Sequence, residues 1–281
     1  MKRLLVGTDG SASGQVAVGW AASLARAIEC ELVVATAWQT PSGTEMPPAF
    51  HDELREEARR VLDDDWCTAT REAGTAYEAL FLEGDPREAL LAAAADTHAD
   101  LVVVGARGTS SHPHAPHLGS VTHHLVHHTT LPLAAIPASA RPVSPTPILV
   151  GVDGSATSAK AVEWCCDVAP GLGAEVIAVY AEVPFAEWVP HRDPSSWYQS
   201  AVKDCEAWTR PLRDAGIATR SLVIEHEPAL ALTETAIRVQ AGLIVVGTRG
   251  TGGITGLRLG STALKVIHHS GLPVVLVPPT P

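Results

Sequence analysis

"RLLVGTDGSASGQVAVGWAASLA" (residues 3–25) joins a short apolar run to a glycine-rich acidic turn and then to a long apolar-periodic stretch. Val16, Trp20, Leu24 and Ile28 recur at four-residue steps, which is typical of one face of a helix. A strand that leads through a tight turn into a helix is the building unit of an open parallel sheet. The segment therefore predicts an α/β fold.

The same pattern returns in "PILVGVDGSATSAKAVEWCCDVA" (residues 147–169). Two later pairs of segments match in the same order: "ADLVVVGARGT" (99–109) with "AGLIVVGTRGT" (241–251), and "LVHHTTLPLAAIP" (125–137) with "KVIHHSGLPVVLVP" (265–278). Because the order is preserved, we interpret the chain as one domain present twice. The expected domains are 1–138 and 147–281, joined by a Pro-rich linker at 139–146.

Each copy alternates short apolar runs with amphipathic stretches. The runs "LVVV" and "LIVV" are apolar at consecutive positions, which is typical of strands covered on both faces by helices. Right-handed crossovers between such strands build an open, doubly wound parallel sheet. We therefore expect two α/β domains in tandem, each with helices on both faces of its sheet.

Composition limits the classes of partner. The 281 residues are 46% hydrophobic and 18% charged, and their formal net charge is −11, which disfavours nucleic acid or an anionic membrane as the main partner. No apolar run is long enough to cross a bilayer, and the apolar stretch before Gly7 is too short for a signal-peptide core. The five cysteines include no CxxC pair, so we expect reduced core thiols in a cytoplasmic protein, with one reactive thiol as the alternative.

Acidic residues follow the first strand of each copy. Ligands of doubly wound sheets bind beyond the carboxyl ends of the strands, where Asp9 and Asp153 are expected to lie. Each carboxylate either accepts hydrogen bonds from a ligand, or holds a metal, or caps the following helix. Their recurrence in the same Gly-x-Asp-Gly-Ser frame favours a ligand role.

A second candidate segment is "GTRGTGGITGLRLGST" (residues 247–262), directly behind an apolar run. Glycines let backbone N–H groups approach a ligand closely. The segment ends on Gly260 and Ser261 at a predicted helix start, where free N–H groups and the helix dipole favour an anion. It predicts a cradle for phosphates, and a mobile surface loop is the alternative.

This segment resembles the nucleotide motif of the universal stress protein family, G-2x-G-9x-G-[S/T], through Gly247, Gly250, Gly260 and Ser261. The resemblance extends over the whole chain, as a tandem two-domain member. It implies five parallel strands per domain in the order 3-2-1-4-5, and ATP, ADP or AMP at the strand tips, bound with Mg²⁺. It also implies that the two copies pair through their last strands as an internal pseudo-dimer, with a further homodimer left open.

The resemblance also implies individual roles. In the second copy Asp153 would contact ribose or, through the nucleotide, the metal, and the backbone of Ala181 would meet the adenine edge. Ribose and phosphates would lie against the remaining motif positions: Gly247, Gly250, Gly260, Ser261 and, as a weaker candidate, Thr262. The matching positions of the first copy are Asp9, Ala37, Gly105, Gly108, Gly119 and Ser120.

The first copy departs from the motif. Ten residues, "TSSHPHAPHL", separate Gly108 from Gly119, where the second copy has nine residues. Pro113 and Pro116 have no N–H and restrict the backbone, so this loop offers fewer donors to a phosphate. We therefore predict that the second site binds nucleotide better than the first, which is altered or empty.

Seven histidines lie between His112 and His128. His123 and His127 have the i, i+4 spacing of metal ligands on a helix. His127 and His128 recur as His268 and His269, which favours an ordinary helix end over a Zn²⁺ or Ni²⁺ site.

The sequence contains no nucleophile elbow, Walker lysine or HExxH, so no catalytic residue is predicted. The expected function is a nucleotide-sensing regulator of a stress response that acts through an unknown protein partner. Two alternatives stay open at this point. One is a slow ATP hydrolase or another adenine-nucleotide enzyme, and the other is a nucleotide-free scaffold with vestigial sites.

Overall fold

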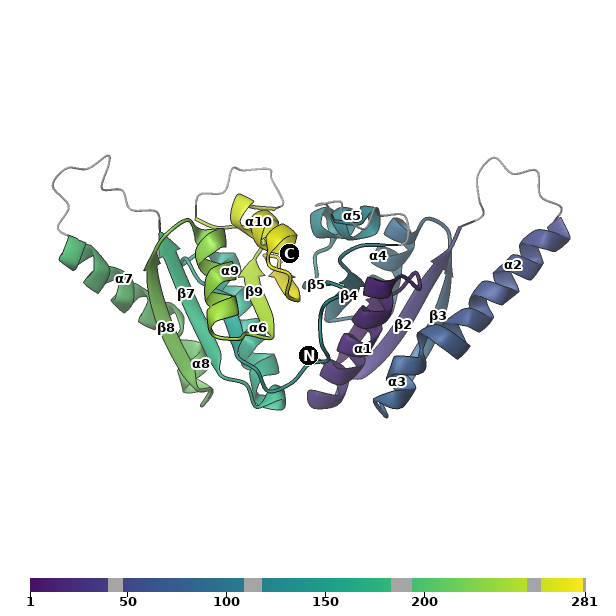
Figure 1. Cartoon of the computed structure of the whole chain (residues 1–281), viewed down its shortest axis with the longest axis horizontal. Helices are drawn as coiled ribbons and strands as arrows, with labels where there is room; N and C mark the ends of the chain where they lie inside the picture. The colour runs from purple at the N-terminus through teal and green to yellow at the C-terminus, as the bar shows by residue number, and fades with distance from the viewer. Residues whose placement is uncertain (40–47, 109–117, 183–193, 252–258, 280–281) are drawn as a thin grey trace. The chain divides into compact units, whose positions relative to one another are not determined.

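The computed structural model describes residues 1–39, 48–108, 118–182, 194–251 and 259–279 (Figure 1). Its internal contacts divide the chain into an N-terminal unit, Met1–Pro142, and a C-terminal unit, Val143–Pro281. The domain bounds 1–138 and 147–281, with the linker between them, stay predictions.

Both units contain the expected parallel sheet. In the N-terminal unit the strand order is β3-β2-β1-β4-β5, with β1 (Arg3–Gly7), β2 (Glu31–Trp38), β3 (Tyr77–Glu83), β4 (Leu101–Gly105) and β5 (Leu133–Ile136). In the C-terminal unit the order is β8-β7-β6-β9-β10, with β6 (Ile148–Gly151), β7 (Val176–Glu182), β8 (Thr219–Glu225), β9 (Leu243–Gly247) and β10 (Val274–Val277). The fold class and the order 3-2-1-4-5 are confirmed in each unit.

Helices cover both faces of each sheet. The N-terminal unit has α1 (Ala12–Ala27), α2 (Pro48–Val61), a π-helical turn η1 (Leu62–Trp66), α3 (Thr68–Glu72), α4 (Pro86–Asp96) and α5 (Ser120–His128). The C-terminal unit has α6 (Ala156–Leu172), α7 (Pro194–Trp208), α8 (Arg210–Asp214), α9 (Pro228–Arg238) and α10 (Ser261–His269). Helix α1 packs on β1 and β4 and also contacts α3. Helix α4 packs on β2 and β3 and contacts α5. Helix α6 packs against β9 and α8, and α9 packs with α10.

The apolar runs noted in the sequence form the two cores. Leu4, Leu5 and Val6 of β1 are buried, as are Val102 and Val103 of β4. Consecutive burial is possible because both faces of these central strands are covered by helices. The same burial holds for β6 and β9 of the C-terminal unit.

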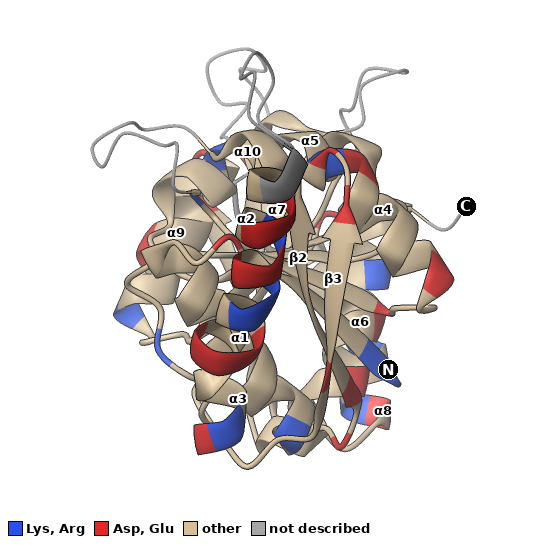
Figure 2. Cartoon of the chain, turned by 90° about the vertical axis from the view of Figure 1, so that its right-hand side faces the viewer, with Lys and Arg blue, Asp and Glu red and all other residues tan. Residues whose placement is uncertain are grey.

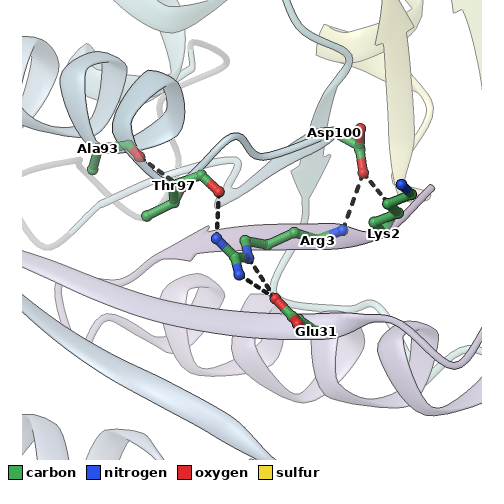
Figure 3. A network of polar contacts seen from close by, with 6 residues as sticks. All are labelled: Lys2, Arg3, Glu31, Ala93, Thr97 and Asp100. Carbon is green, nitrogen blue, oxygen red and sulfur yellow. Dashed lines mark hydrogen bonds and ion pairs between the residues drawn. The ribbon is translucent and has the colours of Figure 1, made fainter.

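Polar contacts of the N-terminal unit gather where β1 begins (Figure 3). Arg3 Nε donates to Glu31 Oε2 at 2.7 Å, and its Nη1 donates to the Thr97 carbonyl at 2.7 Å. Asp100 accepts the backbone N–H of Lys2 at 2.5 Å and of Arg3 at 3.1 Å. These bonds link the starts of β1 and β2 to the turn before β4, at the edge opposite the carboxyl ends.

Charged residues mark the solvent side of α2 (Figure 2). Arg55 forms an ion pair with Glu83 at 2.6 Å, which links α2 to the end of β3. Within the described ranges, no helix has both the length and the apolar character that crossing a bilayer would require.

Candidate functional site

A cavity of about 470 Å³ opens at the carboxyl ends of β6, β7 and β9 in the C-terminal unit. Its described lining contains every position predicted for the second copy: Asp153, Ala181, Gly247, Gly250, Gly260, Ser261 and Thr262. The fold therefore brings together residues that are far apart in the sequence. Residues 252–258 of the glycine-rich segment lie outside the described residues.

A cavity of about 380 Å³ occupies the same place in the N-terminal unit. Its described lining likewise contains the predicted positions Asp9, Ala37, Gly105, Gly108, Gly119 and Ser120. Residues 109–117, which include three of the clustered histidines and both prolines, lie outside the described residues. Both volumes are within the range of small-molecule sites, about 300–1,000 Å³.

Asp153 joins two backbone segments at the mouth of the larger cavity. Its Oδ1 accepts the N–H of Ser155 at 3.0 Å, and its Oδ2 accepts the N–H of Thr251 at 3.0 Å. The first bond has its counterpart in Asp9 Oδ1 and the N–H of Ser11, also at 3.0 Å. The carboxylate thus holds the end of the glycine-rich loop against the turn after β6.

The serines, and not the aspartates, cap the first helices. Ser11 Oγ accepts the N–H of Gly14, and Ser155 Oγ accepts the N–H of Ser158, each at 3.1 Å. The alternative in which the aspartates are helix caps is therefore wrong. Each aspartate instead accepts the backbone N–H of the capping serine itself.

The glycines permit close packing around each carboxylate. A Cβ added to Gly250 would lie 2.6 Å from Asp153 Oδ2, and one added to Gly108 would lie 2.7 Å from Asp9 Oδ2. A Cβ on Gly247 would lie 2.7 Å from the backbone carbon of Thr157 in α6. These glycines therefore have a structural reason besides the one expected from the sequence, the approach of N–H groups to a ligand.

The last helix of each unit begins without a side-chain cap. Helix α10 starts behind Gly260 and α5 starts behind Gly119, and neither glycine can supply a capping oxygen. The other helices that begin at this edge and whose caps are described have a side-chain oxygen there: Ser11 on α1, Asp85 on α4, Ser155 on α6 and Glu227 on α9. Among the residues that the structure describes, no side chain caps the first N–H groups of α5 and α10, which can therefore bond an acceptor in the cavity.

Two polar atoms beside the larger cavity are buried without a hydrogen-bond partner in the described part of the chain. They are Thr248 Oγ1 and Arg249 Nε, both on residues that line the cavity. Buried polar groups normally find a partner, so such atoms at a cavity indicate a place for water or a ligand. The backbone carbonyl of Arg249 is held by the hydroxyls of Ser155, at 3.3 Å, and Thr157.

Aromatic residues at the cavities were missed by the sequence analysis. Trp38, Trp66 and Phe81 line the cavity of the N-terminal unit. The glycine after each first-strand aspartate has a positive φ and lies against an indole ring: Gly10 against Trp66 and Gly154 against Trp208. The two tryptophans occupy matching places in "DWCTATREAG" (65–74) and "AWTRPLRDAG" (207–216), and this match was the available signal.

The clustered histidines that the structure describes lie on α5. His124 and His128 stack with ring centroids 3.9 Å apart, and His123 lies 4.8 Å from His127. Burial and the neighbouring histidines lower the pKa of His127. In the described ranges no three potential ligands are grouped closely enough to hold a metal ion. His112, His114 and His117 lie outside the described residues.

The pKa of each of the five thiols is raised, which disfavours the reactive thiolate. Burial raises the pKa of Cys30 to about 11, and it raises the pKa of the other cysteines, Cys67, Cys165, Cys166 and Cys205. Since the thiolate is the nucleophile, these positions favour the core role over the reactive thiol.

The fold and cavities define a tandem protein of two doubly wound α/β units. The universal stress protein family model matches residues 1–137 and 145–278, and the chain belongs to this family. Universal stress protein Rv2623 of Mycobacterium tuberculosis is 30% identical, and the match spans 97% of this chain and 95% of that protein.

Solved structures of universal stress proteins are similar to this chain. A universal stress protein from Archaeoglobus fulgidus superposes with a TM-score of 0.76 at 21% identity, over 98% of this chain and 97% of that chain. A universal stress protein solved in complex with cAMP is 29% identical over 49% of this chain and 98% of that chain, with a TM-score of 0.40. The first of these comparisons confirms the fold of the whole tandem chain.

Proposed function

We propose that the C-terminal cavity binds an adenine nucleotide, ATP or its products ADP and AMP, and that the protein acts as a nucleotide-responsive regulator in a stress response. The observation that carries this proposal is the convergence on one cavity of Asp153, the described glycines Gly247 and Gly250, and the uncapped start of α10. The helix start can bind the phosphates, and the nearby carboxylate of Asp153 can accept hydrogen bonds from the ribose hydroxyls.

The donors at this cavity offset the acidity of the chain. The net charge of −11 opposes an anionic ligand at long range, so local groups must hold it. The N–H groups at the start of α10 and the guanidinium of Arg249 supply positive potential at the cavity. Hydrogen bonds to a charged phosphate contribute about 1.5–3 kcal/mol each, so a few of them outweigh the long-range repulsion.

The site also fits Mg²⁺ bound with the nucleotide. Each oxygen of Asp153 accepts one N–H bond and keeps a lone pair. Mg²⁺ is typically bound by one or two carboxylates together with phosphate oxygens. Asp153 is therefore the residue that would hold the metal. The ion would neutralise part of the phosphate charge.

The proposal favours a regulator over an enzyme. The acidic groups among the described lining residues are Asp153 and Glu182. Asp153 holds the loop, and Glu182 Oε2 accepts bonds from Trp197 Nε1 at 2.7 Å and from the Tyr180 hydroxyl at 3.0 Å. A carboxylate engaged in this way is a weak general base. ATP turnover should be much slower than about 1 per second, the low end for dedicated enzymes.

Partners and compartment follow from the same proposal. The nucleotide state would be passed to a protein partner in the cytoplasm, without nucleic acid or membrane. Pairing of the two copies through their last strands, and any further homodimer, stay predictions from the family resemblance.

Gly260→Asp and Gly119→Asp test the nucleotide site. A Cβ on Gly260 would meet its nearest neighbour, the Thr248 carbonyl oxygen, at 3.4 Å, so Gly260→Asp acts through its charge rather than through a clash. We expect calorimetric ATP affinity to fall about 100-fold or more in Gly260→Asp, because the carboxylate faces the phosphates. Gly119→Asp should leave the affinity of the main site unchanged.

The second variant needs a stability control. A Cβ on Gly119 would lie 3.0 Å from the backbone nitrogen of Gly108, which is tighter than at Gly260. Thermal melts of both variants separate lost binding from lost folding. Equal loss of ATP affinity in the two variants would contradict the ranking of the sites, and unchanged affinity in Gly260→Asp would contradict the proposed function.

A further inference from the structure

Helices α4 and α5 of the N-terminal unit pack against each other and bring a carboxylate close to an imidazole (Figure 1). His124 Nε2 on α5 lies 3.2 Å from Glu88 Oε1 on α4. The two atoms are not aligned for a hydrogen bond, and His124 Nε2 is buried without a hydrogen-bond partner in the described part of the chain. Because buried polar atoms normally have a partner, this nitrogen indicates a place for one that both groups could share.

The spacing of this pair suits a metal ion. Zn²⁺ binds imidazole nitrogen and carboxylate oxygen at about 2.0–2.2 Å in a tetrahedral arrangement, which places two ligand atoms about 3.3 Å apart. His124 Nε2 and Glu88 Oε1 already have this separation. A direct bond between an imidazole and a carboxylate can be equally long, but its N–H is directed at the oxygen. The missing alignment therefore favours a shared ion over a direct bond.

His128, one turn further along α5, is the candidate for a third ligand. Its ring stacks on the ring of His124, with the centroids 3.9 Å apart and 13° between the planes. His128 Nδ1 donates to the backbone carbonyl of His124 at 2.8 Å, so in the neutral ring Nε2 is the nitrogen with a lone pair. A hydrogen bond of this kind orients metal-binding imidazoles in many proteins.

The described arrangement places two of these ligands at coordination spacing, and no third one joins them. The lone pair of an imidazole nitrogen lies in the ring plane, so nearly parallel rings direct their lone pairs side by side. The His128 ring must therefore tilt toward the His124 ring before both nitrogens can bind one ion. His128 is exposed, which gives its ring room to tilt.

The repeat distinguishes this group from the histidines of an ordinary helix end. Helices α5 and α10 have nine residues each, and α4 and α9 have eleven each, so their positions can be compared one by one. Lys265 stands at the place of His124, and Leu230 stands at the place of Glu88. His269 repeats the third candidate alone. Two of the three groups thus belong to the N-terminal unit only, and the shared fold does not require them.

We propose that Glu88, His124 and His128 bind a divalent transition metal ion such as Zn²⁺, which joins α4 to α5. Two imidazoles and one carboxylate suit such an ion better than Mg²⁺, which prefers oxygen ligands. Water completes the coordination. None of the three residues belongs to the described lining of either cavity, so this site is separate from the proposed nucleotide site.

Calorimetric titration of the untagged full-length protein, freed of metal and nucleotide, tests this site. The probe is Zn²⁺, and Mg²⁺ is the comparison ion. Glu88→Leu and His124→Lys install the residues of the C-terminal unit. Each should weaken Zn²⁺ binding at this site at least about tenfold, since even the partners of metal ligands contribute 10–100-fold. No Zn²⁺ binding by the wild-type protein, or equally tight Mg²⁺ binding, would overturn the proposal.

His123→Leu is the matched control. It also installs the residue of α10, Leu264, but it removes an imidazole outside the proposed site and should leave the Zn²⁺ affinity unchanged. Thermal melts show that each variant folds, and Zn²⁺ should raise the melting temperature of His123→Leu more than that of His124→Lys. Zn²⁺ bound elsewhere in the chain survives His124→Lys. Unchanged Zn²⁺ binding in this variant, or equal loss in His123→Leu, would overturn the proposal.

Discussion

Helices α5 and α10 occupy equivalent places in the two units, but each contacts its neighbouring helix through different chemistry. In the C-terminal unit Lys265 Nζ lies 3.0 Å from Glu227 Oε1, the side chain that caps α9. In the N-terminal unit His124 takes the place of Lys265 and lies 3.2 Å from Glu88 Oε1. An imidazole ring thus stands in one unit where the other has a lysine side chain.

This difference indicates which positions of the repeated domain can differ between the two units. The buried strand residues are apolar in both units, since their side chains must pack under helices. A side chain at the carboxyl end of a strand that lines a cavity can differ between the units without disturbing the packing under the helices. Trp38 and Glu182 are the clearest pair.

The largest expected effect separates the two first-strand aspartates. Asp153→Ala removes the acceptor of two backbone N–H bonds and releases the loop end at Thr251. We expect ATP affinity to fall roughly 100-fold, because bonds to a carboxylate are worth about 1.5–3 kcal/mol each. Asp9→Ala is the matched control and should change ATP affinity less than about twofold. Equal losses in calorimetric titrations would remove the distinction between the units.

The second prediction concerns a feature that the units share. Gly247→Ala places a Cβ 2.7 Å from the Thr157 backbone, and Gly105→Ala places one 2.7 Å from the Ser13 backbone. Both should lose about 1–3 kcal/mol of unfolding free energy through overpacking. Gly19→Ala in α1 is the control, since its Cβ would meet Ala69 at an ordinary 3.5 Å. Urea unfolding measures all three, and an unchanged midpoint for Gly247→Ala would contradict the close packing.

The third prediction tests the serine caps. Ser155→Ala and Ser11→Ala each leave a first-turn N–H without its side-chain acceptor. A loss of about 1 kcal/mol of unfolding free energy is expected for each. Ser155→Asp preserves a capping oxygen and should retain most of the stability. If the alanine and aspartate variants melt at the same temperature, the cap contributes nothing measurable.

The smallest effect concerns pH. Burial alone would raise the pKa of Glu227, but hydrogen bonds from the N–H of Leu230 and from Lys265 outweigh it and lower the pKa. A lowered folded-state pKa gives stability that is present above the unfolded value, about 4.3, and is lost as the pH falls through the folded value. Lys265→Met should cost at most about 1 kcal/mol near pH 7, because the pair is partly exposed and screened by solvent.

The matched variant of this last pair is His124→Met. Its partner Glu88 is largely exposed, so the loss should likewise be at most about 1 kcal/mol near pH 7. Denaturant unfolding across pH 3–8 measures whether the Lys265→Met loss shrinks as Glu227 becomes protonated, as its lowered pKa requires. A Lys265→Met loss that stays the same from pH 7 to pH 3 would contradict the contribution of this ion pair.

Much of the fold could be predicted from particular residues. The strand at Leu4–Val6, the turn at Gly7–Ser11 and the periodic stretch after it form β1, its turn and α1. The repeat then assigns the second unit without further argument. Capping by Ser11 rather than Asp9 could not be decided, because both side chains suit a helix start.

The sequence predicted where the two candidate sites lie, but it did not predict all of the residues in which they differ. The glycine motif predicted the edge at which both cavities lie, and an altered first site, inferred from the prolines between Gly108 and Gly119, stays a prediction. Trp38, Trp66 and Phe81 were missed as lining residues, since aromatic residues at such spacings usually belong to a core. Only the strand register and the packing on Gly10 show that they surround one cavity.

The sequence by itself determined the repeat, the parallel sheets and the edge at which both cavities lie, because hydrophobic periodicity and turn chemistry act between near neighbours in the chain. The tertiary structure decided which side chains share a cavity and how the two cavities differ. Trp66 meets Gly10, and Asp153 meets Thr251, across long stretches of sequence. Such contacts depend on how strands are ordered and helices packed, and no local pattern encodes them.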